Sequence, residues 1–105
     1  MSEKSSLQDM QHIIHDWINS HGGYWSPLAM LSAVIEEVGE LAKEINHLEG
    51  YKPKKGNGKE SKVGEELADI LYALVCIANY YKIDLTKELK DTITKYSERD
   101  SNRFL

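Results

Sequence analysis

Apolar side chains recur every three or four positions along most of this chain, which is the spacing of amphipathic helices. The pattern predicts four helices, at about residues 7–20, 27–48 and 61–81 and from residue 85 onward. The strict alternation of a β-strand does not occur in the sequence, and no segment is repeated. We therefore predict an all-α fold in which four helices form a bundle-like protomer.

Residues suited to helix starts precede three of these helices. Ser6 followed by Asp9 has the pattern of a capping box. Ser26 followed by Pro27 places a capping serine before a proline in the first helical position. Asp84 is suited to cap the last helix. These residues support the boundaries that the apolar pattern predicts.

The third helix departs from the amphipathic pattern. From Asp69 onward it reads DILYALVCIANYY, which is apolar or aromatic on every face for more than two turns. A helix that is apolar all round is buried all round. Because one chain of this size rarely encloses a helix completely, we expect this helix to pack in an oligomeric helical core, so that the protein is a homo-oligomer.

Length and composition fit one domain that spans residues 1–105. The chain has a mass of 12.0 kDa, with 41% hydrophobic and 29% charged residues, which is ordinary for a globular protein with a modest core. Residues 51–61 combine lysines with glycine and proline, and we expect them to form a flexible loop between the second and third helices.

Charge, cysteine content and apolar stretches exclude several classes of protein. The net charge of −4 argues against binding of a nucleic-acid polymer, which requires an excess of basic residues. The longest apolar stretch, residues 70–78, is too short to cross a membrane. The single Cys76 cannot form an internal disulfide, and the N-terminal residues do not resemble a signal peptide. We expect a cytoplasmic protein that does not associate with membranes.

Two pairs of acidic residues lie on helices that are otherwise strongly apolar. Glu37 and Glu40 are three positions apart, as are Glu66 and Asp69, so the members of each pair share one helix face. If the second and third helices are antiparallel neighbours, the carboxylates meet and repel one another unless cations compensate. Carboxylate oxygens suit Mg²⁺ or Mn²⁺. The alternative is an ordinary solvated surface.

These acidic residues carry a resemblance to a known family. Glu36-Glu37-x-x-Glu40, followed after a 25-residue gap by Glu66-x-x-Asp69, resembles the signature of MazG-type nucleotide pyrophosphohydrolases. The segments SPLAMLSAVIEEVGELAKEINH, EELADILYALVCIANYYKIDL and KYSERDSNRF extend the likeness to the short, single-domain bacterial members. The resemblance implies a Mg²⁺-dependent hydrolase that cleaves nucleoside triphosphates between the α and β phosphates. It also implies dimers or tetramers.

The resemblance implies specific roles for the acidic residues. The implied metal ligands are Glu37, Glu40, Glu66 and Asp69. Glu36 lies one position, about 100°, around the helix from Glu37, and we expect it to support the ligands or to act as the catalytic base for the attacking water. Glu44, further along the same helix, is expected to be solvated.

Basic residues near the C-terminal end are candidates for binding the phosphates. Lys95, Arg99 and Arg103 lie about one turn apart, similar basic positions occur in the family, and a guanidinium group matches phosphate oxygens. The alternative is that they complement the dipole of the last helix. Asn79 matches an asparagine of the family, and we expect it to bind either substrate or another helix.

Aromatic residues are candidates for stacking on a nucleobase. Tyr24 and Trp25, in the loop before the second helix, are the best placed, whereas Trp17 has the helical spacing of a core residue. The sequence leaves the preferred base and sugar open. A house-cleaning role against non-standard nucleotides is one interpretation.

Two other functions fit parts of the sequence. A di-iron site needs a Glu-x-x-His motif on each of two helices; Glu44 and His47 supply one such motif, and the third helix supplies none. The main alternative is a non-catalytic, oligomeric helical module that binds nucleotides or proteins. All four residues implied as metal ligands are present, which favours the enzyme.

Overall fold

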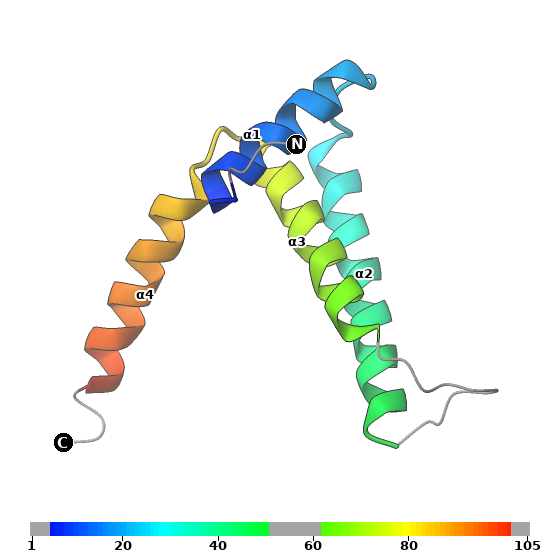
Figure 1. Cartoon of the computed structure of the whole chain (residues 1–105), viewed down its shortest axis with the longest axis vertical. Coiled ribbons are helices and arrows are strands. Elements are labelled where there is room, and N and C mark those ends of the chain that lie inside the picture. The colour runs from blue at the N-terminus through cyan, green and yellow to red at the C-terminus, as the bar shows by residue number, and fades with distance from the viewer. Residues whose placement is uncertain (1–4, 51–61, 102–105) are drawn as a thin grey trace.

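The computed structural model of the chain describes residues 5–50 and 62–101, which form four helices. They are α1 (Leu7–Ser20), α2 (Pro27–Leu48), α3 (Val63–Tyr80) and α4 (Leu85–Ser101), shown in Figure 1. No strand occurs among the described residues, so the predicted all-α fold is confirmed. The predicted loop at 51–61 lies outside the described residues.

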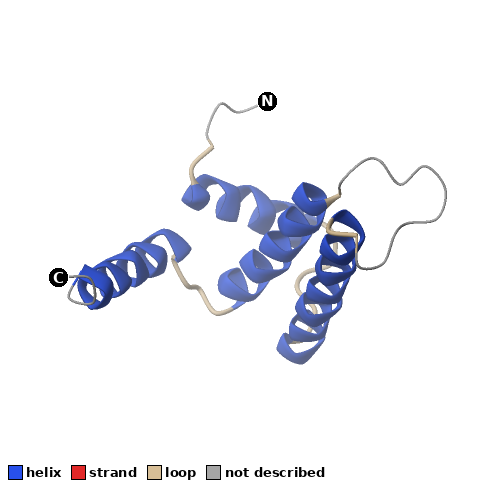
Figure 2. Cartoon of the chain, turned by 90° about the horizontal axis from the view of Figure 1, so that it is seen from below, coloured by secondary structure: helices blue, strands red, loops and turns tan. Residues whose placement is uncertain are grey.

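The helices are arranged as two arms that meet at α1. Helices α2 and α3 run antiparallel, side by side, and form one arm, while α4 forms the other (Figure 1). Seen from below, α4 again stands apart from α2 (Figure 2). Helix α1 packs against α3 and against α4 at the apex. One chain therefore packs three of its helices together and leaves the fourth projecting.

The predicted helix starts are present. The Asp9 N–H donates to the Ser6 hydroxyl over 3.1 Å and the Ser6 N–H donates to the Asp9 carboxylate over 3.2 Å, which completes the capping box of α1. The Ala29 N–H donates to the Ser26 hydroxyl over 3.2 Å at the start of α2. The Asp84 carboxylate accepts a bond of 3.0 Å from the Thr86 N–H, so Asp84 caps α4.

A glycine pair turns the chain between α1 and α2. Gly22 and Gly23 have φ angles of 105° and 88°, in the left-handed region that favours glycine. The Gly23 N–H donates to the Ile18 carbonyl over 2.9 Å and closes the end of α1. This turn delivers Tyr24 and Trp25 to the side of α2.

The hydrophobic core of a single chain is small. Its buried apolar side chains are Met30, Val75, Cys76 and Ala78. On α3, Leu67 and Leu71 remain half exposed. Within the described residues of one chain α3 is therefore only partly buried, and the burial of its other faces in an oligomeric core stays a prediction.

Paired amides fix the junction of α1, α3 and α4. The buried Gln11 side chain donates to the Asn79 side chain over 3.0 Å and to the Ile83 carbonyl over 2.9 Å. Its oxygen accepts a bond of 2.9 Å from the Leu85 N–H at the start of α4. The Asn79 amide donates to the Gln11 carbonyl over 2.9 Å. These bonds set the direction in which α4 leaves the apex.

Helix α4 carries an apolar stripe that the described residues of its own chain leave exposed. Leu89, Ile93 and Tyr96 lie one turn apart and are all substantially exposed. Among the described residues, no helix is long and apolar enough to span a membrane.

Candidate metal centre and adjoining cleft

Helices α2 and α3 bring acidic residues from both predicted pairs together. Glu37, Glu66 and Asp69 each offer one carboxylate oxygen, and these oxygens all lie within 4.8 Å of one another. We call these three residues the carboxylate triad. Glu37 and Glu66 are partly buried and Asp69 is exposed. Hard oxygen donors at this spacing could hold a metal ion and suit Mg²⁺ or Mn²⁺.

The other two acidic residues of the signature lie outside the triad. Glu40 is exposed, but its negative charge is close enough to contribute to the raised pKa of Glu66. Glu36 is exposed and does not share the oxygen cluster. The structure thus brings three of the four predicted ligands together and places Glu40 beside them.

The carboxylates of the triad repel one another. Partial burial is the first cause that raises the pKa of Glu66 above its ordinary value of 4.5, and the charges of Asp69, Glu37 and Glu40 raise it further. A carboxyl group in this position gains from a proton or from a cation. The chemistry of the donors therefore fits a divalent metal ion.

Glu44 corrects a prediction made from the sequence. It is only 8% exposed, and its carboxylate accepts a bond of 3.2 Å from the Lys62 N–H at the start of α3. Lys62 supplies no side-chain cap of its own to this helix. The expectation that Glu44 is solvated is wrong because its helix face points toward α3, where the positive end of the helix dipole attracts it.

The position of Glu44 relates it to the triad. It lies seven positions after Glu37 on the same face of α2. Its partner Lys62 accepts a bond of 2.9 Å from the Glu66 N–H through its carbonyl. Glu44 therefore ties α2 to the turn of α3 that carries Glu66.

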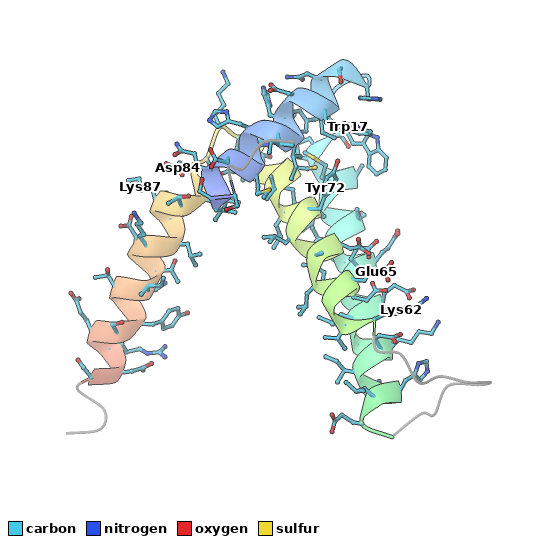
Figure 3. The ribbon with its side chains drawn as sticks, in the orientation of Figure 1. Trp17, Lys62, Glu65, Tyr72, Asp84 and Lys87 are labelled. Carbon is cyan, nitrogen blue, oxygen red and sulfur yellow. The ribbon has the colours of Figure 1, made fainter. Side chains whose placement is uncertain are left out.

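A cleft of about 550 Å³ opens next to the triad. Glu37 and Asp69 belong to its lining. The aromatic residues of the lining are Trp17, His21, Tyr24, Trp25 and Tyr72. Figure 3 shows Trp17 and Tyr72 at the end of the α2–α3 arm that meets α1. The volume is in the range of sites for small molecules, and the lining combines aromatic faces with two acidic groups.

Trp17 departs from the sequence prediction. It was expected in the core from its helical spacing, but it is 53% exposed. Its indole stacks on the His21 ring, with centroids 3.9 Å apart and planes at 11°. The His21 side chain lies 2.7 Å from the Trp17 carbonyl, which anchors the stack. A cleft wall and a core face have the same sequence spacing, so the pattern alone did not reveal Trp17, His21 or Tyr72.

Tyr24 and Trp25, which the sequence predicts to stack on a nucleobase, lie in the same cleft as Glu37 and Asp69. Both line the cleft. Tyr24 is partly buried, and Trp25 is 68% exposed. The stacking role predicted for them remains a proposal.

The predicted phosphate-binding residues do not reach the triad within one chain. Lys95 and Arg99 lie on α4, over the Tyr96 ring at 4.9 Å and 4.4 Å from its centroid. Arg99 also donates to the neighbouring Asp100 carboxylate over 2.9 Å. Because α4 forms the separate arm in Figure 1, these cations lie away from the acidic groups of α2 and α3. Arg103 lies outside the described residues.

The Asn79 side chain forms hydrogen bonds at the junction of α3 and α1. Its amide bonds to Gln11 of α1, and it is not part of the cleft lining. Of the two roles that the sequence left open, the bonds to Gln11 are to another helix, while Asn79 also hydrogen-bonds to Tyr24 of the cleft lining.

Comparison with known proteins identifies the family. The fold and the triad describe an all-α protein with a candidate metal centre. The family model of the MazG nucleotide pyrophosphohydrolase domain matches residues 25–104. The chain therefore belongs to the MazG nucleotide pyrophosphohydrolase family, as the acidic signature suggested.

Relatives from Bacillus are similar over nearly the whole chain. The protein YpjD of Bacillus subtilis strain 168 is 40% identical over 105 residues, which cover 99% of this chain and 94% of YpjD. A crystal structure of YpjD from Bacillus subtilis matches with a TM-score of 0.78 and 38% identity, covering 90% of this chain and 96% of that one. The crystal structure of a Bacillus-conserved MazG protein, a nucleotide pyrophosphohydrolase, matches with a TM-score of 0.74 and 36% identity, covering 90% and 93%.

Proposed function

We propose that this nucleotide pyrophosphohydrolase hydrolyses nucleoside or deoxynucleoside triphosphates between the α and β phosphates, with Mg²⁺ or Mn²⁺. The products are the nucleoside monophosphate and pyrophosphate. The observation that carries the proposal is that Glu37 and Asp69 belong both to the carboxylate triad and to the aromatic cleft. A nucleotide bound in the cleft has its base against aromatic rings and its phosphates near the acidic groups.

The triad, together with Glu40, would hold the cation. When bound, a divalent ion neutralises phosphate charge and lowers the pKa of water. Without it, the triad would repel the triphosphate, because both are negatively charged. Glu36 is the proposed acceptor of the proton of the attacking water.

The aromatic residues would bind the base. Tyr24 and Trp25 present rings to the cleft from the loop before α2, and Trp17 does so from α1. Stacking on an aromatic ring is tolerant of base identity, because every base has a π face. Asn79, which matches an asparagine of the family, is a further candidate for substrate contact. In this structure its side-chain amide hydrogen-bonds to Gln11.

The phosphate-binding cations would come from a second copy of the chain. Lys95 and Arg99 lie on an arm that projects from the rest of the protomer, and Arg103 follows on the same segment. The exposed stripe of Leu89, Ile93 and Tyr96 on that arm gains from burial against another chain. A homodimer or homotetramer would bury it and carry the cations toward a partner's triad.

A house-cleaning role is the proposed cellular function. An enzyme that converts triphosphates to monophosphates removes non-standard nucleotides from the pool on which polymerases draw. We propose that the whole chain acts as one domain in the cytoplasm. The alternative of a non-catalytic module gains no support, since the family is one of hydrolases and the acidic residues of the signature are present.

Product analysis tests the proposal. Incubation with a panel of ribonucleoside and deoxynucleoside triphosphates and Mg²⁺, followed by ³¹P NMR, should show monophosphate and pyrophosphate. Asp69→Asn should lose more than about 100-fold in rate, since even residues that only orient metal ligands are worth 10–100-fold. Release of orthophosphate and the nucleoside diphosphate would instead show cleavage between the β and γ phosphates and would disprove the proposal. The absence of turnover with every member of the panel would also disprove it.

A further inference from the structure

Tyr24 is held by a histidine that does not itself line the cleft. The His15 Nδ1 atom lies 2.7 Å from the Tyr24 hydroxyl oxygen, and the two rings stack with centroids 5.7 Å apart and planes at 28°. Tyr24 belongs to the cleft lining, whereas His15 stands behind it on α1. Any effect of His15 on a bound nucleotide must therefore pass through Tyr24.

A second hydrogen bond defines which nitrogen of His15 carries the proton. The Asn19 side-chain nitrogen lies 3.0 Å from the His15 Nε2 atom, one helical turn away. An amide nitrogen only donates, so Nε2 of the neutral ring accepts and the hydrogen is on Nδ1. That hydrogen points to the Tyr24 oxygen. His15 therefore donates to Tyr24, and the hydrogen of the phenol is left to donate elsewhere.

Side-chain contacts restrain the Tyr24 ring. Gly22 and Gly23, which precede it, turn the chain with positive φ angles. Trp25, which follows, is largely exposed. The contacts of the Tyr24 ring are made with residues outside this loop. They include the edge of the Tyr80 ring, with centroids 6.4 Å apart.

The hydroxyl is protonated at neutral pH. Partial burial raises the pKa of Tyr24 above its ordinary value of 10.0, while a hydrogen bond from Asn79 opposes this shift. A neutral phenol accepts the bond from His15 without placing a negative charge beside the triad. The contact is therefore compatible with an anionic substrate nearby.

We infer that His15 is a positioning residue of the nucleotide site: it fixes the Tyr24 ring as a wall of the cleft, in the orientation in which a base can stack on it. This inference rests on the proposed function, because it assigns the cleft to the base. A ring held before the ligand arrives loses less conformational freedom on binding. The contribution of His15 is thus expected in substrate binding and not in the chemical step.

Steady-state kinetics test the inference with four variants. His15→Ala and Tyr24→Phe should each raise KM by roughly 3- to 10-fold, the value of one hydrogen bond, and leave kcat within about twofold. The double variant should be no worse than Tyr24→Phe, because Tyr24→Phe already removes the bond that His15→Ala removes. The amide nitrogen of His15→Asn can replace Nδ1 as donor, so the KM of this variant should lie between those of His15→Ala and the wild type. His12→Ala, an exposed histidine one turn earlier on α1, should match the wild type.

Other results would overturn the inference. If His15→Ala lowers kcat and thermal stability while Tyr24→Phe leaves KM unchanged, His15 is only a structural residue of α1. A long-range ¹H–¹⁵N NMR spectrum of the nucleotide-free protein adds an independent readout. It should show the hydrogen of His15 on Nδ1, and a hydrogen on Nε2 would contradict the bond. The position of the His15 hydrogen does not depend on whether triphosphates are hydrolysed. A hydrogen on Nε2 would therefore contradict the inference about His15 without contradicting the proposed function.

Discussion

The carboxylates of Glu37 and Asp69 meet across the α2–α3 contact, although the two residues lie on different helices and 32 positions apart in the sequence. Their oxygens lie within 4.8 Å of each other and of one from Glu66, and both residues also line the aromatic cleft. The same two side chains therefore border the candidate metal centre and the candidate base site. If the proposed function is correct, this arrangement would place a bound nucleotide's phosphates next to the proposed cation.

Glu66 should make the stability of the metal-free protein depend on pH. Because its pKa is raised in the folded protein, the folded chain binds the proton more readily than the unfolded chain. The resulting stabilisation is complete below the ordinary pKa of 4.5 and is lost as the pH rises through the raised value. Thermal unfolding in EDTA, followed from about pH 4.5 to 7.5, should show this loss in the wild type and a flatter profile in Glu66→Gln.

A bound metal ion should offset the loss of stability that ionised Glu66 causes at neutral pH. At neutral pH, Mg²⁺ at about 100 times its Kd should raise the Tm of the wild type by roughly 10 °C. Glu66→Gln should show little of this increase, because the variant has lost a charged ligand. An equal increase in both proteins would mean that the ion binds elsewhere.

Glu44 should matter for both stability and metal affinity. Removal of a helix cap costs about 0.5–2 kcal/mol, so Glu44→Ala should lower the Tm by roughly 2–8 °C. Because the cap lies one turn from Glu66, the variant should also bind Mn²⁺ more weakly in isothermal titration. Glu49→Ala, which removes an exposed carboxylate at the end of α2, is the matched control. Similar behaviour of the two variants would contradict the role of Glu44.

Trp25 should contribute to nucleotide binding without supporting the fold. Its side chain is 68% exposed, so Trp25→Ala should leave the Tm nearly unchanged. Loss of one stacking contact should raise KM for a nucleoside triphosphate by roughly 5- to 150-fold, with a much smaller change in kcat. Trp25→Phe keeps an aromatic face and should recover most of the affinity. An unaltered KM in Trp25→Ala would remove the residue from the base site.

Two inactive variants should restore activity when they are combined. If the cations of α4 serve a partner's triad, coexpression of Asp69→Asn with Arg99→Ala gives mixed dimers in which one of the two sites is intact. Random assembly then recovers about a quarter of wild-type activity. Lys87→Ala should remain active, because Lys87 is on the same helix but is paired with Asp91 over 3.0 Å. Failure to recover activity, in coexpressed protein shown to be mixed, would mean that Arg99 does not act across subunits.

The local features of the fold could be predicted from the sequence. The observed bounds of α2, Pro27–Leu48, agree with the prediction, because Ser26 and Pro27 specify the start within a few residues. The capping box of Ser6 and Asp9 is likewise a short-range interaction. Signals of this kind depend on neighbours in sequence and are therefore visible without the fold.

Features that depend on the contact between helices were harder to predict. Glu44 and Glu40 look alike in sequence, but Glu44 is buried because the start of α3 lies against it. Trp17 has the spacing of a core residue, yet its neighbours form a cleft instead of a packed layer. The direction of α4 depends on the Gln11 side chain at the apex, 74 positions before the Leu85 N–H that it binds.

The most direct test of the account is a crystal structure of the protein with Mn²⁺ and a non-hydrolysable nucleoside triphosphate, with anomalous diffraction to locate the metal. The account predicts an anomalous peak among the carboxylates of Glu37, Glu66 and Asp69, phosphate oxygens beside it, and the base against Tyr24 or Trp25. A metal peak away from these carboxylates, or a nucleotide bound outside the cleft, would contradict it.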